Sequence, residues 1–200
     1  MTLRGLYAIT PEGPEFAVIE ARVRAALEGG VAAVQYRAKS GTAAQRRREA
    51  AALGRLCRAR GVPLIVNDDV ELALAVDADG AHLGRGDGEL AAARARLGTK
   101  LLGASCYDDL ALARRAVAAG ADYIAFGSVF PSPTKPQAVR APLSLFSTPL
   151  PVPRCAIGGI TLENAPLVIA AGAQLLAVVS DLFDAPDVRR RALDYGRLFT

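Results

Sequence analysis

The stretch AGADYIAFG (119–127) joins the end of a helix-like segment to an apolar strand through small residues and one glycine. Three further stretches share this design: GGVAAVQ (29–35), ADGAHLG (78–84) and AGAQLLAVV (171–179). Their glycines, at positions 30, 80, 120 and 172, recur at intervals of about two strand–helix units. Glycine at such joints suits the left-handed conformation that ends a helix before a strand. The chain therefore contains a partial internal repeat of helix-to-strand joints.

Short apolar runs alternate with amphipathic segments rich in Ala, Arg and Leu along the whole chain. The predicted strands are LYAIT (6–10), AAVQYRA (32–38), PLIVND (63–68), GAHLG (80–84), KLLGAS (100–105), YIAFGSV (123–129), RCAIGGI (154–160) and LLAVVSD (175–181). Helix-length segments cover 15–28, 42–60, 108–119 and 186–197. The linker PLSLFSTPLPVP (142–153) has room for a short helix at most.

The number and spacing of these units predict an α/β fold, a single-domain (β/α)8 TIM barrel over residues 1–200. An even number of units with a twofold period fits such a barrel, because its interior layers come from alternate strands. An open doubly wound sheet is the alternative. It needs no such regularity, and no GxGxxG motif follows the first predicted strand.

The composition excludes several classes of partner. The net charge is only +4, aromatic residues make up 6% and tryptophan is absent, which argues against nucleic-acid binding. The arginine runs at 46–48 and 189–191 lie in helical patterns and are interpreted as solvated helix faces. The longest apolar run, AQLLAVVSDLF (173–183), is too short to span a bilayer.

The cysteines indicate the compartment. There are 3, at widely spaced positions and without a CxxC or Cys/His pattern, which predicts buried, reduced thiols. The start MTLRGLYAITPEG lacks the apolar core of a signal peptide. We therefore expect a cytoplasmic protein, and whether it forms a homo-oligomer stays open.

Polar residues gather where the predicted strands end, and in a TIM barrel the active site lies at these carboxyl ends. The helix-to-strand joints, by contrast, are mainly Gly, Ala and Pro. The candidates are Gln35, Arg37 and Lys39 at the end of the second strand, Asn67 and Asp68 at the end of the third, Asp87 after the fourth, Ser105 at the end of the fifth, Ser132, Thr134 and Lys135 after the sixth, Gly158 and Gly159 at the end of the seventh, and Val179 and Ser180 at the end of the eighth.

Two of the carboxylates form a modest candidate site for Mg²⁺. Asp68 and Asp87 follow neighbouring strands, and Mg²⁺ in proteins is often held by two carboxylates, water and substrate phosphate. Each also has a simpler interpretation, since Asp68 could cap the next helix and Asp87 could be a turn residue. Asp69 is the better candidate for the cap, which leaves Asp68 for the site.

The remaining candidates point to anionic ligands. Arg37, Lys39 and Lys135 supply the cations that a diphosphate needs, although the first two could also belong to a solvated strand end. Backbone N–H groups at Gly158–Gly159 could bind a second phosphate, with Thr161 as the expected N-cap of the next helix and Val179–Ser180 as the opposite wall.

No general base is evident. His82, the single histidine, lies mid-strand and is interpreted as a core or supporting residue. Cations and a metal without a base suit a reaction driven by the loss of a good leaving group.

Taken together, VQYRAK, LIVNDDVELALAVDADGAHLGRGD, LLGASCYDD, ADYIAFGSVFPSPTK, AIGGITLENA and AVVSDLF resemble the thiamine phosphate synthase family in order and spacing. The resemblance covers nearly the whole chain. It implies a TIM barrel that joins a hydroxymethylpyrimidine diphosphate to a thiazole phosphate and releases pyrophosphate.

The resemblance also implies roles for the candidate residues. Gln35, Arg37, Lys39 and Asn67 would hold the pyrimidine diphosphate, Ser105 would contact the pyrimidine and Lys135 its diphosphate, Asp68 and Asp87 would bind Mg²⁺, and Ser132, Thr134, Gly158, Gly159, Val179 and Ser180 would bind the thiazole phosphate. Arg37, Lys39, Ser105 and Lys135 would be the catalytic residues of a dissociative substitution.

The chain departs from the family at a few positions. The family commonly has Glu where this chain has Ala38, Gln where it has Arg85 and Thr where it has Ser132. The residues Pro136-Gln137, which follow Lys135 here, are also not the usual ones. Two other functions remain as alternatives. A thiazole tautomerase of the same fold would need a histidine near the end of strand five, where this chain reads SCYDD (105–109). A barrel that binds phosphorylated ligands without turnover is the other.

Overall fold

Eight parallel strands form a closed barrel in chain order in the computed structural model, which describes residues 3–131 and 139–200. The strands are β1 (Gly5–Ile9), β2 (Ala33–Tyr36), β3 (Leu64–Asn67), β4 (Gly80–Leu83), β5 (Leu101–Tyr107), β6 (Tyr123–Phe126), β7 (Arg154–Ile157) and β8 (Leu175–Val178). β1 pairs with β8, so the barrel has no free edge, and the predicted TIM barrel is confirmed.

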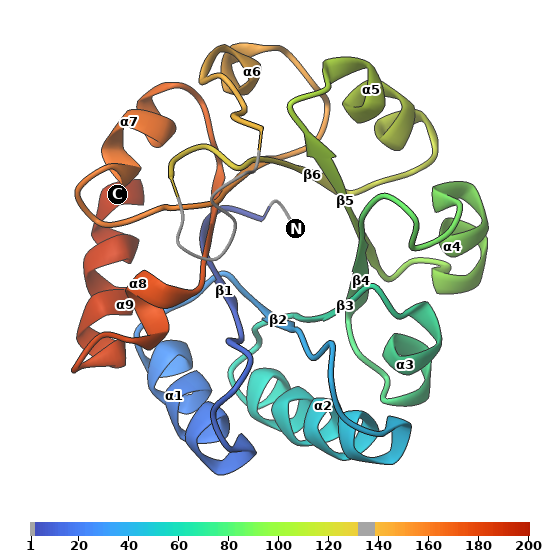
Figure 1. Ribbon diagram of the computed structural model, residues 1–200, viewed down its shortest axis with the longest axis vertical. Helices are drawn as coiled ribbons and strands as arrows, with labels where there is room; N and C mark the ends of the chain where they lie inside the picture. Colours follow the sequence, from blue (N-terminus) through green and yellow to red (C-terminus); the bar gives the residue numbers. More distant parts are fainter. Residues whose placement is uncertain (1–2, 132–138) are drawn as a thin grey trace.

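Helices surround the barrel (Figure 1). They are α1 (Phe16–Glu28), α2 (Ala43–Arg58), α3 (Val70–Ala75), α4 (Leu90–Leu97), α5 (Leu110–Ala118), α6 (Ser144–Ser147), α7 (Ala165–Ala170), α8 (Ser180–Phe183) and α9 (Val188–Gly196), with a final 3₁₀ turn at Arg197–Phe199. The predicted helices at 15–28, 42–60, 108–119 and 186–197 match α1, α2, α5 and α9. The proline-rich linker forms only the four-residue α6, as expected.

The alternation of side chains along each strand separates two apolar layers. One face of each strand packs against the helices, and the other faces the barrel interior. The interior layer consists of Leu3, Tyr7, Ile9, Ala33, Ile65, Tyr123, Ala125, Cys155, Leu175 and Ala177. By the same period of two, Gln35, Asn67, His82 and Ser105 also belong to the interior face, and Gln35 pairs in register with Ile9 and Ile65 of this layer.

The left-handed glycine joints are confirmed at three of the four positions. Gly30, Gly120 and Gly172 have φ of +85°, +92° and +110°. The prediction is wrong for Gly80, which is the first residue of β4, and at this joint Asp77 takes the left-handed conformation with φ +51°. A Cβ at Gly80 would overlap the backbone of β5, so close strand packing explains that glycine.

The helix-to-strand joints are more polar than predicted. The side chains of Asp79, Asp122 and Gln174 each accept a backbone N–H near the start of a neighbouring strand, at 2.8, 2.7 and 2.9 Å in β3, β5 and β7. These acceptors stand two residues after Asp77, Gly120 and Gly172, the left-handed residues of the joints. Because they serve every second strand, they give the internal repeat a structural meaning: each one fixes the start of a strand.

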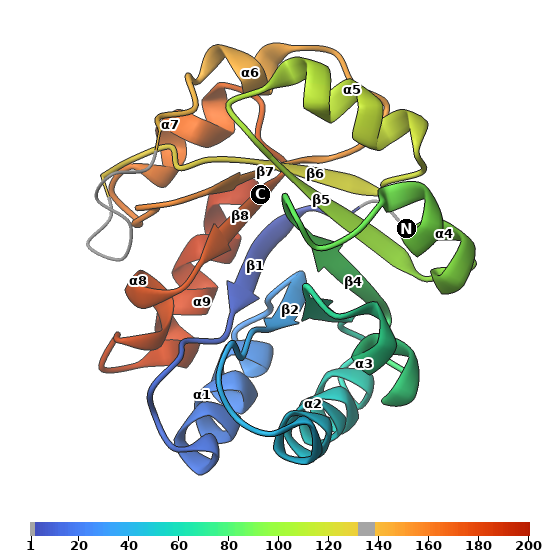
Figure 2. The same cartoon turned by 45° about the vertical axis from the view of Figure 1, so that its right-hand side comes forward.

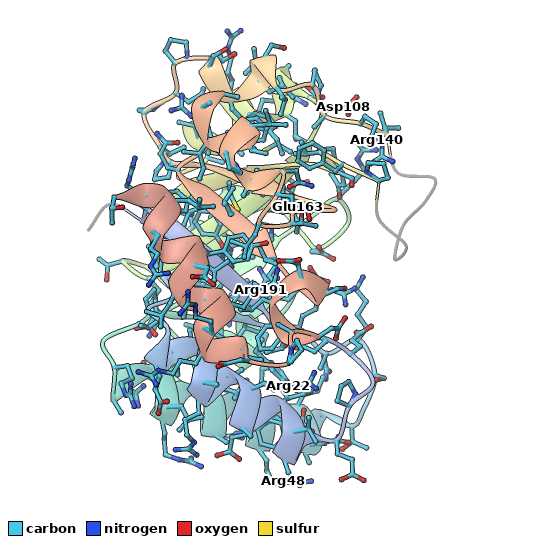
Figure 3. The ribbon with its side chains drawn as sticks, turned by 90° about the vertical axis from the view of Figure 1, so that its left-hand side faces the viewer. Arg22, Arg48, Asp108, Arg140, Glu163 and Arg191 are labelled. Atoms are coloured by element: carbon cyan, nitrogen blue, oxygen red, sulfur yellow. The ribbon has the colours of Figure 1, made fainter. Side chains whose placement is uncertain are left out.

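The outer surface agrees with the interpretation of the arginine runs. Arg47 and Arg48 are exposed, and Figure 3 shows Arg48 at the outer edge of the molecule. Arg190 pairs with Asp194 and Arg191 with Asp181. Cys57, Cys106 and Cys155 are all free and buried, as predicted. Within the described ranges, no helix is both long and apolar enough to cross a bilayer.

Candidate active site at the barrel mouth

The segments that follow β1 and β2 bring cations and a carboxylate together at the carboxyl end of the barrel. The guanidinium of Arg37 lies 3.3 Å from the carboxylate of Glu12, which also accepts a hydrogen bond from the backbone N–H of Lys39 at 2.7 Å. The backbone N–H of Arg37 also donates a hydrogen bond to the Thr10 hydroxyl at 2.9 Å. Glu12 therefore neutralises a cation of the predicted diphosphate site, a role that the sequence did not indicate.

The side chains of Asp68, after β3, and Asp87, after β4, lie close enough to interact. Burial, together with the neighbouring carboxylate of Asp87, raises the pKa of Asp68, while Lys39 and Asn67 oppose this shift. The ammonium of Lys39 lies 4.0 Å from the Asp68 carboxylate. Asp68 has φ +63°, an uncommon value for a residue other than glycine, and this turn separates its side chain from that of the next residue.

The next residue, Asp69, is the helix cap, as predicted. Its side chain accepts the backbone N–H of Leu72 at 2.8 Å and so caps α3. The side chain of Asp87 accepts the backbone N–H of Gly84 at 2.7 Å, which closes the short loop after β4. That loop holds Asp87 in place opposite Asp68.

The donor set fits a hard divalent cation. The carboxylate of Asp87 raises the pKa of Asp68, so a bound cation would stabilise the pair, and oxygen donors are the ligands that Mg²⁺ prefers. Within residues 3–131 and 139–200, no cluster of three or more His, Cys, Asp or Glu side chains forms a fuller metal site. Asp68 and Asp87 would thus need water or substrate oxygens to complete the coordination.

A buried chain of hydrogen bonds crosses the barrel interior below this mouth. The Nε2 group of Gln35 donates to the hydroxyl of Tyr7 at 2.8 Å, and the hydroxyls of Tyr7 and Tyr123 are 2.8 Å apart. The Tyr123 hydroxyl lies 3.1 Å from Nδ1 of His82, whose Nε2 lies 2.9 Å from the Ser105 hydroxyl. We call these five residues the interior hydrogen-bond chain.

The interior hydrogen-bond chain links two candidates that the sequence treated separately. Gln35 comes from β2 and Ser105 from β5, and Tyr7, Tyr123 and His82 connect them. The two tyrosines were not predicted, although their alternation with other interior residues could have placed them on the inner face. Gly103 makes room for the connection, because a Cβ there would overlap the ring of Tyr123.

Burial sets the protonation of this chain. Desolvation lowers the pKa of His82 to about 4, so the imidazole is neutral near pH 7. Desolvation also raises the pKa of Tyr7 and that of Tyr123 well above their usual range, so both remain phenols. The chain is therefore an uncharged polar network in a low-dielectric interior.

Gly158 and Gly159 form a tight turn after β7, with φ of +97° and +64°. A Cβ on Gly158 would overlap Ser128, and one on Gly159 would overlap the backbone around Pro131. The turn therefore packs against the segment that leads toward Ser132, Thr134 and Lys135. These three candidates lie outside the described residues.

Thr161 is not the N-cap that the sequence predicted. Helix α7 starts at Ala165 with Asn164 as its N-cap residue. Thr161 and Asn164 instead form a reciprocal turn, in which the backbone N–H of Thr161 donates to the Asn164 side chain at 2.9 Å. In return the Thr161 hydroxyl accepts the backbone N–H of Asn164 at 3.4 Å, so Thr161 makes a cap-like contact in the turn just before α7.

Val179 and Ser180 stand at the start of α8, which lies beside α9 (Figures 1 and 2). The neighbouring Asp181 accepts hydrogen bonds from Arg191 at 3.0 Å and from the Tyr195 hydroxyl at 2.7 Å. These bonds tie α8 to α9, and Figure 3 shows Arg191 beside α9, toward α8. They fix the position of Ser180 at the mouth.

The structure describes the contacts of two residues that differ from the usual family residues, Arg85 and Ala38. Arg85 lies with its guanidinium carbon 4.9 Å from the centre of the Tyr107 ring, and its backbone N–H donates to the Tyr107 hydroxyl at 2.9 Å. Ala38 is partly buried and packs against the layer between strands and helices. Arg85 therefore lies near the predicted metal site, within the loop that holds Asp87.

The amino-acid sequence matches one family of known proteins. Residues 6–182 match the family model described as thiamine monophosphate synthase. The chain is 59% identical to the thiamine-phosphate synthase of Aromatoleum aromaticum, over 98% of this chain and 97% of that protein. It is 58% identical to that of Thiobacillus denitrificans, over 98% of this chain and 94% of that protein.

A solved structure gives the same result. The thiamine phosphate pyrophosphorylase from Pyrococcus furiosus superimposes with a TM-score of 0.88 at 34% identity, over 99% of this chain and 96% of that one. A 3-hexulose-6-phosphate synthase shares only the fold, at 16% identity and a TM-score of 0.72. The resemblance found in the sequence is thus confirmed, and the chain belongs to the thiamine monophosphate synthase family.

Proposed function

We propose that this chain is a transferase that joins an aminopyrimidine methyl diphosphate to a thiazole phosphate, forming thiamine monophosphate and releasing pyrophosphate. Membership of the family supports the reaction. The observation that carries the site is the convergence of the Asp68–Asp87 pair with Lys39 at the barrel mouth. A carboxylate pair next to a cation is the arrangement that a metal-bound diphosphate requires.

The first substrate would occupy the mouth between β2 and β5. The diphosphate would lie against Arg37, Lys39 and the two carboxylates. Its pyrimidine ring would extend toward Gln35 and Ser105, which form the ends of the interior hydrogen-bond chain. Lys135, which lies outside the described residues, is proposed as a further cation for the diphosphate.

The second substrate would bind on the side of β7 and β8. The turn at Gly158–Gly159 offers backbone groups without the obstruction of a Cβ. The first N–H groups of a helix have no partner within the helix, so Ser180 at the start of α8 offers donors as well. Val179, with Ser132 and Thr134 outside the described residues, completes the proposed thiazole phosphate site.

The reaction would proceed by departure of pyrophosphate before the new bond forms. Mg²⁺ bound by Asp68 and Asp87 would supply charge compensation for the leaving group. Arg37 and Lys39 would bind the oxygens of the departing pyrophosphate and offset the negative charge that develops on them. The electron-rich aminopyrimidine would support the methylene cation, which the thiazole nitrogen then attacks. Holding both partners in one mouth supplies much of the rate.

The tautomerase alternative finds no support in the described residues. His82 is the single histidine of the chain, and its two ring nitrogens contact Tyr123 and Ser105 inside the barrel. It therefore does not stand in the loop after β5. The free, buried cysteines support our placement of the enzyme in a reducing compartment, the cytoplasm.

The test is a pyrophosphate-release assay with the purified chain and both substrates, with and without Mg²⁺. Release that requires both substrates and the metal supports the proposal. Binding of either substrate without release would indicate a barrel that binds phosphorylated ligands. Conversion of a thiazole carboxylate phosphate to its isomer without metal would indicate a tautomerase.

A further inference from the structure

We propose that the interior hydrogen-bond chain is directional, that it holds His82 as the Nε2–H tautomer, and that it thereby leaves the Ser105 hydroxyl proton free to donate into the barrel mouth. Tyr7, Tyr123 and His82 are then positioning residues, since they act on a ligand only through Gln35 and Ser105. The tautomer is a property of the protein alone. Only the identity of the group that Ser105 meets rests on the proposed function.

The direction is set at the Gln35 end. The amide nitrogen of Gln35, which can only donate, faces the oxygen of Tyr7 at 2.8 Å. The Tyr7 oxygen therefore accepts there, and its own proton has the Tyr123 oxygen as an acceptor at 2.8 Å. If Tyr123 donated to Tyr7 instead, the proton of Tyr7 would be left without an acceptor in this chain of bonds, inside a fully buried site.

The same logic passes along to Ser105. Because Tyr123 accepts from Tyr7, its proton is available for Nδ1 of His82 at 3.1 Å. An imidazole that accepts at Nδ1 carries its proton on Nε2 when it is neutral. That N–H then donates to the Ser105 oxygen at 2.9 Å. Each link between neighbouring residues thus has one donor and one acceptor, an arrangement in which successive bonds strengthen one another in a low dielectric.

Four residues of the interior hydrogen-bond chain are buried, so water does not compete for their hydrogen bonds and change the direction of donation. The exposed fractions are 1% for Tyr7, 0% for Tyr123, 3% for Gln35 and 7% for His82. Solvent therefore has little access to the inner links. Ser105 is only partly buried and stands at the mouth end of the chain.

The two ends consequently present opposite hydrogen-bonding groups to a ligand. At one end, the Gln35 amide is engaged through its nitrogen, so its oxygen remains as an acceptor. At the other end, Ser105 receives a hydrogen bond and retains its own proton as a donor. A ring nitrogen flanked by an exocyclic amino group is the complementary chemistry, and the aminopyrimidine of the proposed function has this pattern.

The first experiment reads the tautomer directly. Because the protein contains a single histidine, selective ¹⁵N-histidine labelling gives an unambiguous pair of ring signals. In a long-range ¹H–¹⁵N correlation of the wild-type protein at pH 7, we expect Nε2 to show the protonated shift and Nδ1 the unprotonated one. The reverse assignment would overturn the proposal. This measurement needs no substrate, so it stands whether or not the proposed reaction is observed.

The second experiment uses Tyr123→Phe, with Tyr36→Phe as the matched control. Tyr36 is also a buried tyrosine, but its hydroxyl donates a hydrogen bond to Glu49 of α2, outside the barrel. We expect Tyr123→Phe to give averaged histidine shifts from two tautomers, whereas Tyr36→Phe keeps the wild-type pattern. An unchanged Nε2–H tautomer in Tyr123→Phe would refute the role of Tyr123.

Kinetics then separate positioning from general damage. Tyr123→Phe should raise KM for the pyrimidine diphosphate about tenfold and leave KM for the thiazole phosphate within about twofold, the signature of one lost binding contact. The double variant Tyr123→Phe/Ser105→Ala should be no worse than Ser105→Ala, because both changes remove the same donor. Equal effects on both substrates, or additive losses, would contradict the proposal.

Discussion

The carboxylate of Asp87 lies against that of Asp68 at the barrel mouth, and this proximity, together with burial, raises the pKa of Asp68. The protein thus holds two negative charges together although Lys39, at 4.0 Å from Asp68, offsets them only in part. Such a pair is unfavourable in isolation and becomes favourable when a cation is bound.

Asp68→Asn should lower kcat/KM at least tenfold at saturating Mg²⁺, on the order of 1.4 kcal/mol in transition-state stabilisation. Asp69→Asn is the matched control, because asparagine also caps helices well and Asp69 serves α3. We expect that control to stay within about twofold of wild type. Pyrophosphate release measures both, and a wild-type rate for Asp68→Asn would remove Asp68 from the site.

The same substitution should stabilise the protein when no metal is present. The raised pKa shows that the charged form of Asp68 is disfavoured in the fold near pH 7. Asparagine tolerates the left-handed φ of +63° at this position. After allowance for solvent screening, we expect the free energy of unfolding in EDTA to rise by a few tenths of a kcal/mol to about 1 kcal/mol. Urea denaturation in EDTA would contradict this if Asp68→Asn proved less stable than wild type.

Glu12→Gln should lower KM for the pyrimidine diphosphate by about threefold, because an ion pair of this exposure is worth under about 1 kcal/mol. In the free protein Glu12 pairs with Arg37 at 3.3 Å, and an anionic substrate must compete with it. Glutamine retains an acceptor for the backbone N–H of Lys39. Glu20→Gln, which removes a pair with Arg24 on α1, is the control. A higher KM in Glu12→Gln would show instead that Glu12 orients Arg37 for the substrate.

The stability of the protein should fall in mild acid through His82. The pKa of this group is about 4 in the fold and 6.5 in its ordinary state, so between these values the unfolded chain binds more protons. The free energy of unfolding therefore decreases as the pH drops from 6.5 toward 4, by up to roughly 3 kcal/mol in total. His82→Gln has no such group, and its unfolding free energy should be flatter between pH 5 and 6.5. Parallel slopes for the two proteins would show that His82 is not the cause.

Gly103→Ala should destabilise the protein by about 1–3 kcal/mol or more, because the added methyl overlaps the Tyr123 ring inside a packed barrel. Gly196→Ala, near the end of α9 with open space around it, should be neutral or stabilise by about 0.5 kcal/mol. Thermal unfolding of both variants measures the difference. A Gly103→Ala protein as stable as wild type would mean that Tyr123 has room to move.

Much of the architecture was accessible from the sequence because it rests on local signals. The joints around Gly30, Gly120 and Gly172 combine a helix end with a strand start, and their spacing carries the symmetry of the barrel. The placement of Asp69 as a cap and Asp68 in the mouth also follows from local chemistry. Once the barrel is assumed, strand ends converge, so the candidates could be grouped without knowing any distance.

The contacts that the sequence did not reveal all join distant elements. Tyr7 and Tyr123 are 116 residues apart and read as ordinary core aromatics, because alternation gives the face of a side chain but not the partner of its hydroxyl. Glu12 lies in a loop rich in Gly and Pro, and its contact with Arg37 depends on how that loop folds back. At Gly80 the sequence showed the right residue type but the wrong reason, since strand packing and not a helix cap requires it.

The pairing of β1 with β8 has a consequence for how the molecule is made. The first strand leaves the ribosome long before the last, so the side of β1 that pairs with β8 stays unpaired until nearly the whole chain has been synthesised. Contacts between such remote segments form late and slow the overall rate of folding. Because Tyr7 belongs to β1, the interior hydrogen-bond chain is assembled on the strand that waits longest for its partner, and a nascent chain halted before residue 175 would lack the strand that seals the barrel beside Tyr7.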